Sequence, residues 1–394
     1  MARTLRVGIV GTGFAGSFHV DSLRRVYGVN VEIAGVTSRR EESRRAFGEK
    51  YGIPVFDDMS AMLSHIDVVD LCTPPSLHAG GIMEAARAGV HVICEKPLSG
   101  YFGPADCGPE YRGDRDAKQP MLDAVRRQLE ELTQAVRTAG IIFGYAENFV
   151  YAPVIRKERE IVAKTGAQIL RMLGEESHNG SGSDLYGIWR YQGGGSLIAK
   201  GCHPLSAMLH LKRVEGLTRL GRPIRPRTVT ARCERLTGIE AYDDRKFIRT
   251  EYHDTEDHGW MHVVFDDGTV GDVIAGEIVL GGIYDYVEVF ANNHRTRCEM
   301  SPVRMAHTFN PSGPQYDDVY TVEKISTKEG WTEISADEHF TMGYIDEAQD
   351  FLACMAAGKE PQSNLDLACD TILTIYAAYL SDEQKGRETT IPVI

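Results

Sequence analysis

Three glycines near the N-terminus have the spacing that binds a pyrophosphate group. They follow an apolar run, Leu5–Val10, and open a helical stretch, in a turn composed of Gly11, Thr12, Gly13, Phe14, Ala15 and Gly16. The first two glycines allow a tight turn and close approach of phosphate, and the third lets the helix pack on the sheet. The helix N-terminus then stabilises the negative charge. Because the turn lies between a strand and a helix, we expect NAD or NADP to bind here rather than a turn without a ligand.

The residues after the second predicted strand bear on the choice between NAD and NADP. An acidic residue at this point would bind the ribose 2′-hydroxyl of NAD. This sequence has Ser38 and Arg39 there instead, and these side chains suit a 2′-phosphate. Arg39 stacked on the adenine would serve NAD equally well, so both cofactors stay open.

The elements around this turn alternate between strands and helices. Strands are expected at Leu5–Val10, Val31–Thr37, Asp67–Cys72, Val90–Cys94 and Ile141–Ala146. This rhythm predicts an α/β Rossmann domain, a doubly wound parallel sheet, over residues 1–147. An inserted loop at 98–120 shows no strand or helix period and is either functional or mobile.

Residues 148–394 have a different rhythm and predict a second, α+β domain. Strand-like runs occur at Gln168–Gly174, Thr228–Cys233, Met261–Phe265, Thr269–Ala275 and Tyr286–Ala291, and two helices are expected at Tyr344–Ala357 and Leu365–Ser381. We interpret these as a mainly antiparallel sheet that binds the substrate.

Composition excludes several classes of function. The net charge of −13 disfavours nucleic acid as a partner. No run approaches the roughly 18 apolar residues of a membrane span, and no signal peptide precedes the first strand. The eight cysteines are scattered without a CxxC motif, which is typical of reduced thiols in a cytoplasmic protein. His253, Asp254, Asp257 and His258 have no zinc spacing, so no metal is expected.

Three further motifs lie where this fold places ligands. The third strand ends at Thr73, Pro74 and Pro75, followed by His78; the next strand ends at Glu95, Lys96 and Pro97; and the second domain contains Gly193–Leu197 and Gly201-Cys202-His203. Together with the glycine turn, they resemble the Gfo/Idh/MocA family of glucose–fructose oxidoreductase and inositol dehydrogenase over nearly the whole chain. The resemblance implies a large open sheet in the second domain, homo-oligomers such as dimers or tetramers, and a sugar, polyol or glycoside substrate.

The resemblance also implies roles for individual residues. Lys96 matches the lysine that binds a substrate hydroxyl beside the nicotinamide, and His203 matches the general base. The cofactor is expected to contact the strand-end residues and an aromatic–basic pair: Thr73, Pro74, Pro75, His78, Glu95, Lys96, Trp189 and Arg190. Trp189 is alternatively a packed anchor of its loop. The chemistry agrees, because a histidine suits proton removal near neutrality and a lysine stabilises a developing alkoxide.

One position departs from the family pattern. Many members carry an aspartate one helical turn before the histidine, and this chain has Ala199 there. Glu147 and Tyr145, at the end of the last Rossmann strand, are candidates to replace it; an ion pair of purely structural role is the alternative for Glu147.

A second group of candidates leaves the first strand of the second domain. His178 and a preceding glutamate could bind sugar hydroxyls or act as acid and base. Since neighbouring strand residues face opposite sides, at most one of Glu175 and Glu176 faces the pocket.

Three functions are compatible with these residues. The first is NAD(P)-dependent oxidation of a secondary hydroxyl of a sugar, glycoside or cyclitol, with hydride transfer to nicotinamide C4. The second is an NAD-dependent glycosidase that oxidises C3, eliminates the aglycone, adds water and returns the hydride. The third is a non-catalytic sugar or NAD(P) sensor, which the presence of Lys96 and His203 disfavours. Arg190 and Lys200 would allow an anionic sugar.

Overall fold

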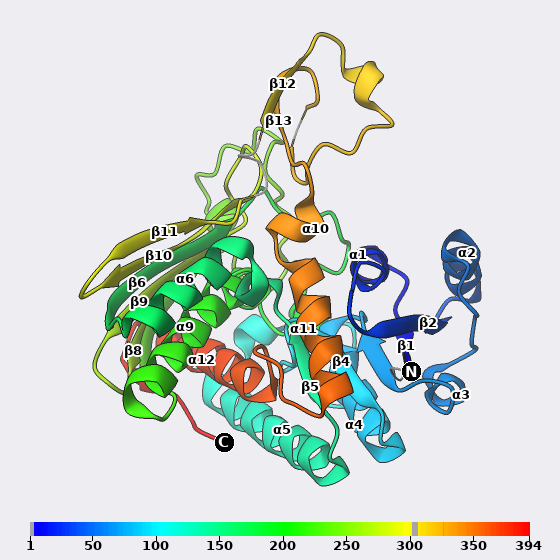
Figure 1. The fold of residues 1–394 in the computed structure, drawn as a ribbon. Coiled ribbons are helices and arrows are strands. Elements are labelled where there is room, and N and C mark those ends of the chain that lie inside the picture. Colours follow the sequence, from blue (N-terminus) through cyan, green and yellow to red (C-terminus); the bar gives the residue numbers. More distant parts are fainter. Residues whose placement is uncertain (1–3, 302–305, 326) are drawn as a thin grey trace.

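The computed structural model describes residues 4–301, 306–325 and 327–394. Two β-sheets lie on opposite sides of the molecule, and helices from both halves of the chain pack between and around them (Figure 1). The N-terminal sheet has five strands and the C-terminal sheet has seven, while a separate two-stranded hairpin projects from the body.

The first domain is the expected Rossmann sheet. Its strands run parallel in the order β2-β1-β3-β4-β5, with β1 Thr4–Val10, β2 Asn30–Thr37, β3 Val68–Leu71, β4 His91–Glu95 and β5 Phe143–Ala146. Its helices are α1 Phe14–Leu23, α2 Glu41–Tyr51, α3 Met59–Leu63, α4 His78–Ala88 and α5 Lys118–Ala139, with short 3-10 turns at Pro75–Leu77 and Gly113–Arg115. All four residues of β3 and of β5 are buried, as expected for central strands covered on both faces.

The second domain confirms the predicted, mainly antiparallel sheet. Its strand order is β11-β10-β6-β9-β8-β7-β14, and β6 pairs with β9 as the parallel exception. The strands are β6 Ile169–Ser177, β7 Pro226–Glu234, β8 His258–Phe265, β9 Val270–Gly276, β10 Tyr284–Ala291, β11 Arg295–Glu299 and β14 Thr389–Thr390. Its other elements are 3-10 turns at Asn148–Tyr151 and Leu236–Gly238 and the helices α6 Pro153–Thr165, α7 Trp189–Gln192, α8 Ser196–Ala199, α9 Cys202–Leu220 and α12 Leu365–Glu383.

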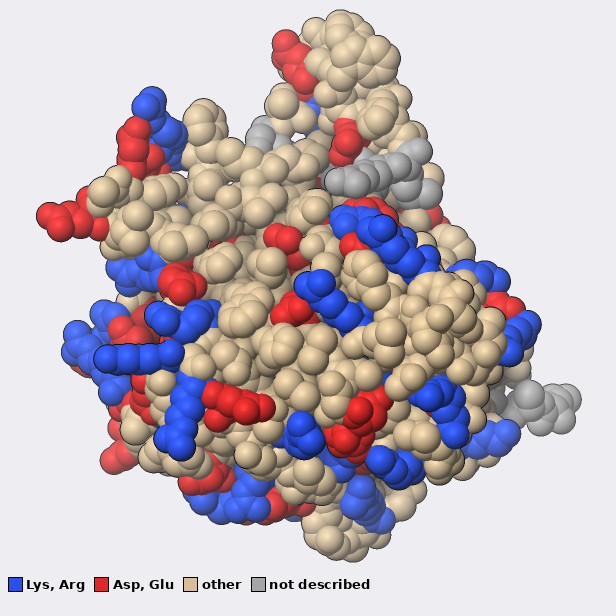
Figure 2. Space-filling model, turned by 90° about the vertical axis from the view of Figure 1, so that its left-hand side faces the viewer, with Lys and Arg blue, Asp and Glu red and all other residues tan. Residues whose placement is uncertain are grey.

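Helices α6, α9 and α12 cover one face of this sheet (Figure 1). Figure 2 views the molecule from the sheet side and shows positive and negative side chains interspersed there, with no large patch of one sign. Ion pairs and cation–π contacts on β10 and β11, such as Arg297 with Glu299 and with the Tyr286 ring, make up part of this pattern.

The sequence analysis missed the projecting arm. It consists of β12 Ala306–Asn310 and β13 Gly330–Ile334, with a 3-10 turn at Gly313–Tyr316, and α10 Glu338–Thr341 follows it (Figure 1). The next helix, α11 Tyr344–Ala357, packs against α1, and α12 packs against α5 and β5. The C-terminal helices therefore belong in space to the first domain as much as to the second.

The inserted loop at 98–120 is tied to the second domain. Trp189 Nε1 donates to the carbonyl of Tyr101 at 2.9 Å, and the Gly113 amide donates to Asp254 at 2.8 Å. Helix α5 begins at Lys118, three residues earlier than the sequence indicated. The loop is therefore a packed bridge between the domains.

All eight cysteines are free thiols. Among the residues that the structure describes, no helix combines the length and the apolar character that crossing a membrane requires.

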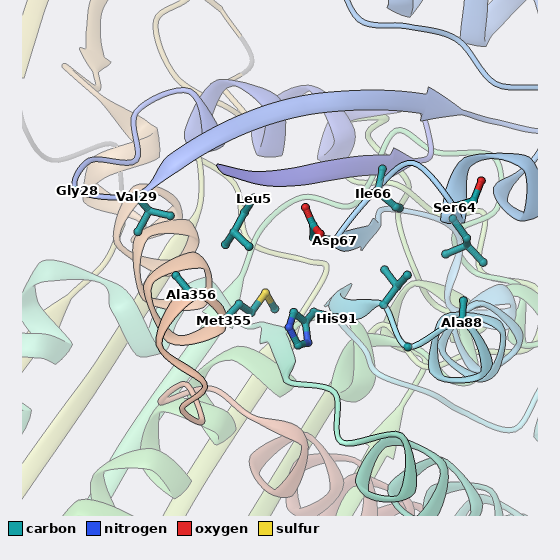
Figure 3. A pocket seen from close by; sticks show the side chains of 13 residues that line it. Leu5, Gly28, Val29, Ser64, Ile66, Asp67, Ala88, His91, Met355 and Ala356 are labelled. Atoms are coloured by element: carbon teal, nitrogen blue, oxygen red, sulfur yellow. The ribbon is translucent and has the colours of Figure 1, made fainter. Parts of the chain in front are cut away.

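A cavity of about 540 Å³ lies at the amino ends of β1, β3 and β4, against Met355 and Ala356 of α11 (Figure 3). Its titratable side chains are already engaged: Asp67 accepts hydrogen bonds from Arg6, and His91 Nδ1 accepts one from Ile142. Ligands of open α/β sheets bind at the carboxyl ends of the strands. We therefore place the candidate site at the opposite end of this sheet.

Candidate active site

The glycine turn forms an open cradle at the carboxyl end of β1. Gly11 has φ +117, and a Cβ there would lie 2.3 Å from the carbonyl oxygen of Cys72. A Cβ on Gly16 would lie 2.3 Å from the carbonyl oxygen of Gly11, whereas nothing lies within 4 Å of a Cβ on Gly13. Gly13 precedes the first turn of α1, so free amides of the helix N-terminus face this open space. The cradle fits a dinucleotide pyrophosphate.

The surrounding residues also fit a dinucleotide. Thr12 Oγ1 donates to Ser38 Oγ at 3.2 Å, which holds the tip of β2 against the turn, and Arg39 is exposed beside it. The Thr73 hydroxyl is buried without a hydrogen-bond partner, and Phe14 is exposed at the mouth of the cradle. Pro74 and Pro75 begin the 3-10 turn after β3. Each of these groups lies at the strand ends, where a dinucleotide would extend.

His78 has a supporting position. Its side chain is fully buried, with Nδ1 2.9 Å from the carbonyl oxygen of Pro97 and Nε2 2.8 Å from that of Thr73. Both ring nitrogens thus face backbone carbonyl groups of the strand ends. His78 braces the segments that carry Thr73 and Lys96.

A second histidine, which the sequence analysis did not select, joins the strand ends from α1. His19 Nδ1 lies 2.8 Å from Asp70 of β3, and its Nε2 lies 3.1 Å from Glu95 of β4. Although burial alone opposes the charge, Asp70 raises the pKa of His19 well above its ordinary value. The resulting imidazolium and the neighbouring Lys96 hold the pKa of Glu95 below its ordinary value despite burial. Glu95 is therefore an ionised, fixed carboxylate.

Lys96 follows at the end of β4, and the peptide bond to Pro97 is cis. Its Nζ donates to the carbonyl oxygen of Ala199 at 3.2 Å, across the boundary between the domains. Burial alone would lower the pKa of Lys96, but Cys202 and Tyr186 raise it above its ordinary value. The ammonium group is thus a permanent hydrogen-bond donor.

His203 lies in the first turn of α9, between two carboxyl groups. Its Nδ1 is 2.5 Å from Glu147 Oε1, and its Nε2 is 3.6 Å from Glu176 Oε2. The imidazole ring stacks on Phe149 with centroids 4.4 Å apart. Glu147 therefore stands where a carboxylate partner of the histidine is needed, and Ala199 contributes its backbone carbonyl instead.

Burial determines the protonation of this group. It lowers the pKa of His203 to about 3 and raises that of Glu147 to about 8. It also raises the pKa of Glu176, although His203 and Lys200 oppose this shift. At neutral pH the His203–Glu147 pair accordingly holds one shared proton.

A second set of polar side chains surrounds Lys200 and His178. Lys200 Nζ donates to the Tyr186 hydroxyl at 3.2 Å and lies 3.6 Å from Glu277. His178 Nδ1 accepts a hydrogen bond from the Gly180 amide at 2.9 Å, so its Nε2 carries the hydrogen. Burial, followed by Lys200, Lys324 and Lys96, lowers the pKa of His178. A neutral His178 can donate one hydrogen bond from Nε2.

Three predicted site residues lie deeper or farther away. Tyr145 is fully buried on β5, and within the part of the chain that the structure describes its hydroxyl has no hydrogen-bond partner. Trp189 packs against Gly113, with the ammonium group of Lys118 4.9 Å from its ring. Arg190 lies with its guanidinium 5.4 Å from the Tyr191 ring. Trp189 thus has the contacts of a loop anchor.

Strand alternation identifies the glutamate that faces the cluster. Glu176 is buried, while Glu175 is half-buried on the other face and accepts a hydrogen bond from Ser177. The sequence predicted that only one of them could face the pocket, and Glu176 is that residue. Its direct partner on β10 is Asp285, which is fully buried, and neither of its carboxyl oxygens has a hydrogen-bond partner among the described residues. Nothing in the sequence near Asp285 signals this neighbour, because the pairing joins distant strands.

Two sets of side chains are close enough together to hold a cation, namely His19–Asp70–Cys72 and Glu147–Cys202–His203. Burial raises the pKa of Cys72 to about 12 and that of Cys202 well above its ordinary value. Both thiols are therefore protonated, and thiols ligate metals as thiolates. The two histidines are already engaged by carboxyl groups.

Comparisons with known proteins agree with this geometry. Residues 5–107 match the Gfo/Idh/MocA family, described as an oxidoreductase family with an NAD-binding Rossmann fold. The match assigns the first domain, over residues 5–107, to the NAD-binding Rossmann fold of this family. The cofactor class of its first domain is therefore a nicotinamide dinucleotide.

Curated relatives that resemble this chain include two sugar dehydrogenases. D-glucoside 3-dehydrogenase of Escherichia coli is 30% identical over 52% of this chain and 54% of its own length. D-xylose 1-dehydrogenase (NADP(+)) 2 of Haloferax volcanii is 27% identical over 66% of this chain and 73% of its own length. The chain thus spans about half of the first of these relatives.

A solved structure shares the fold over the full length. GenD2 from gentamicin A biosynthesis, in complex with NAD, has a TM-score of 0.78 and 21% identity, covering 100% of this chain and 98% of GenD2. At this identity the similarity establishes the fold.

Proposed function

We propose that this Gfo/Idh/MocA protein is an NAD(P)-dependent oxidoreductase that oxidises a secondary hydroxyl of a sugar, glycoside or cyclitol. The observation that carries the proposal is the His203–Glu147 pair, 2.5 Å apart, together with Lys96, whose Nζ donates to the carbonyl oxygen of Ala199, four residues before His203. A base, its carboxyl partner and a fixed cation thus meet at the carboxyl ends of the Rossmann strands. The relatives that act on sugar hydroxyls support the same class of substrate.

Each residue has a definite part in this reaction. Lys96 donates a hydrogen bond to the substrate oxygen and stabilises the developing alkoxide. His203 takes the hydroxyl proton at Nε2, and Glu147 stabilises the imidazolium through Nδ1. When bound, a nicotinamide dinucleotide supplies the acceptor for the hydride that leaves the substrate carbon carrying that hydroxyl. His178 orients a neighbouring hydroxyl through its Nε2 hydrogen.

We propose NAD as the cofactor, with NADP as the alternative that Ser38 and Arg39 support. Arg39 is exposed, and no ion pair engages its guanidinium among the described residues. Fluorescence titrations of the wild type with NADH and NADPH decide between them. A dissociation constant for NADPH at least tenfold lower than that for NADH would overturn the choice of NAD.

A second candidate function, the NAD-dependent glycosidase, is favoured by Glu176. Elimination from a 3-keto glycoside needs a further acid or base beyond Lys96 and His203. Glu176 is buried, its pKa is raised, and its carboxyl group lies 3.6 Å from His203 Nε2. A protonated Glu176 is therefore suited to protonate a leaving oxygen.

One experiment distinguishes the candidates. The enzyme is incubated with sugars, cyclitols and aryl glycosides, with and without added NAD or NADP. Net formation of NADH or NADPH supports the oxidoreductase. Aglycone release without net change in the cofactor refutes it in favour of the glycosidase. Cofactor binding with no turnover of any kind would favour the sensor. His203→Ala should abolish either activity, and full activity of that variant would remove His203 as the base.

We also propose a cytoplasmic homo-oligomer, a dimer or tetramer assembled through the face of the seven-stranded sheet that α6, α9 and α12 leave uncovered. Aromatic and charged side chains, including Tyr286 and Arg297, lie on this face. Light scattering measures the mass directly, and a monomer at micromolar concentration would refute this assembly.

A further inference from the structure

His19, in the second turn of α1, lies between two carboxyl groups that extend from β3 and β4. The two oxygens of Asp70 lie 3.0 and 2.8 Å from its Nδ1, and Glu95 Oε1 lies 3.1 Å from its Nε2. Each ring nitrogen therefore faces an acceptor, and only the imidazolium form can donate from both nitrogens. The geometry indicates a charged histidine that joins two strand ends to the helix after the glycine turn.

Strand pairing places these carboxyl groups on one face of the Rossmann sheet. Asp70 pairs with Ile93 of β4, and Glu95 follows Ile93 by two residues, which returns its side chain to the same face. A small cavity on this face is lined by His19, Asp70 and, from α11, Glu347. Because His19 is only 6% exposed and Asp70 is fully buried, solvent screens the attraction between them little.

The charges around His19 balance when its ring is protonated. Three further titratable side chains line the same cavity or contact Asp70, namely Glu347, Tyr344 and Cys72. Burial raises the pKa of all three well above their ordinary values, so each of them is neutral near pH 7. The carboxylates of Asp70 and Glu95 are then matched by the imidazolium and by the adjacent ammonium group of Lys96.

Glu95 connects the imidazolium to the backbone of Lys96. Its second oxygen, Oε2, accepts a hydrogen bond from the Lys96 amide at 2.9 Å, and the Lys96 ammonium group donates to the carbonyl oxygen of Ala199 at 3.2 Å. A carboxylate with a cationic donor on one oxygen and an amide donor on the other has a fixed orientation. The backbone from which the Lys96 side chain extends is therefore held from α1, through His19 and Glu95.

We propose that His19 is a positioning residue, which acts through Glu95 to hold the Lys96 ammonium group where it binds the substrate hydroxyl. This inference rests on the proposed oxidoreductase function. Without the imidazolium, Glu95 loses its charged partner, and the buried Asp70 is left without a cation. Since a displacement of about 1 Å can lower a rate about 100-fold, kcat should fall about 10- to 100-fold in His19→Gln.

NMR of the side-chain nitrogens of isotopically labelled histidine tests the charged ring directly, on the enzyme saturated with NADH. At about pH 8.5 a histidine with an ordinary pKa is neutral, whereas His19 should give an imidazolium signal with both nitrogens protonated. That signal should be absent from His19→Gln. A wild-type spectrum without any imidazolium at this pH would overturn the proposal whether or not the variant folds, and so would an imidazolium signal that the variant retains in full.

Single and double variants test whether His19 acts through Glu95. His19→Gln and Glu95→Gln should each lower kcat with the best substrate of the panel, and the double variant should lose no more than the more severe single variant. Fold losses that multiply in the double variant would overturn action through Glu95.

The affinity for NADH separates positioning of Lys96 from anchoring of α1, whose N-terminus forms the cofactor cradle. In fluorescence titrations, the dissociation constant of His19→Gln for NADH should stay within about threefold of the wild-type value, because the glycine turn is unchanged. A loss of NADH affinity as large as the loss in kcat would overturn the proposal in favour of a role in anchoring the helix.

The matched control is His210→Gln. His210 is also a buried histidine, and its Nε2 has no hydrogen-bond partner within the described ranges of the chain. It lies on α9 and lines a separate cavity between α6 and α9, so His210→Gln should keep kcat within about twofold of the wild type. A loss equal to that of His19→Gln would attribute both effects to disturbed packing and overturn the proposal.

Failure of this inference is distinguishable from failure of the proposed function. Turnover by His19→Gln with a kcat within about twofold of the wild type would overturn the positioning role and leave the oxidoreductase intact. A wild type that binds NADH and shows the imidazolium, but oxidises no sugar, glycoside or cyclitol, would refute the oxidoreductase and the positioning role together.

Discussion

Replacing Glu147 by glutamine tests the central pair of the site. The substitution keeps the shape of the side chain but removes the carboxylate that lies 2.5 Å from His203 Nδ1. The imidazolium formed on proton transfer then loses its charged partner. Since a hydrogen bond to a charged group contributes about 1.5–3 kcal/mol, kcat should fall about 10- to 150-fold.

The KM of the variant should change little, because the charge on His203 develops only as the proton moves. The assay is steady-state cofactor reduction with the best substrate of the panel, followed by the absorbance of the reduced nicotinamide at about 340 nm. The matched control is Glu158→Gln. Glu158 is also fully buried and lies 2.7 Å from a histidine, His294, but it belongs to α6 outside the cluster.

The control should keep kcat within about twofold of the wild type, as expected for a pair that touches no reacting atom. A kcat for Glu147→Gln within about twofold of the wild type would refute the assignment of Glu147 as the partner of the base. An equal loss in both variants would show that the effect comes from disturbed packing.

Three further results are expected. The kcat for oxidation should increase as pH rises through the pKa of Glu147, about 8. Below that pH the protonated Glu147 donates to His203 Nδ1, so His203 Nε2 carries the ring hydrogen and cannot accept the substrate proton. A flat kcat profile between about pH 6 and 9 would contradict this expectation. Gly11→Ala should lower Tm and weaken NADH binding by more than about tenfold in fluorescence titrations, because the added Cβ overlaps the backbone. Gly28→Ala, with open space around its Cβ, should leave NADH binding unchanged. Similar NADH affinities in the two variants would argue against the cradle. Burial raises the pKa of Asp285 well above its ordinary value. Since Asp285 ionises more readily in the unfolded chain, the wild type should lose stability as pH rises, and Asp285→Asn should gain stability relative to it from pH 5 to 8, by up to about 1.4 kcal/mol per pH unit in denaturant titrations. A pH-independent difference would show that Asp285 is ionised in the fold.

Local sequence patterns were sufficient to predict the strands and helices of the first domain. Its strands are short apolar runs separated by helices that end at left-handed glycines such as Gly52 and Gly89, so period and turn chemistry predict it directly. The arm escaped prediction because β12 and β13 are exposed strands that pair only with each other. With few buried positions, they lack the apolar alternation by which a strand is recognised.

The sequence by itself determined the parts of the site that depend on neighbours along the chain. The glycine turn and the Glu95-Lys96-Pro97 strand end belong to this class, since each needs only a few consecutive residues in one conformation. Tertiary structure decided the partners. Glu147 and His203 are 56 positions apart, and Lys96 reaches a carbonyl group 103 positions away. Whether Trp189 packs against a cofactor or within a loop likewise depended on packing between distant segments, because burial and pairing energies arise only when those segments meet.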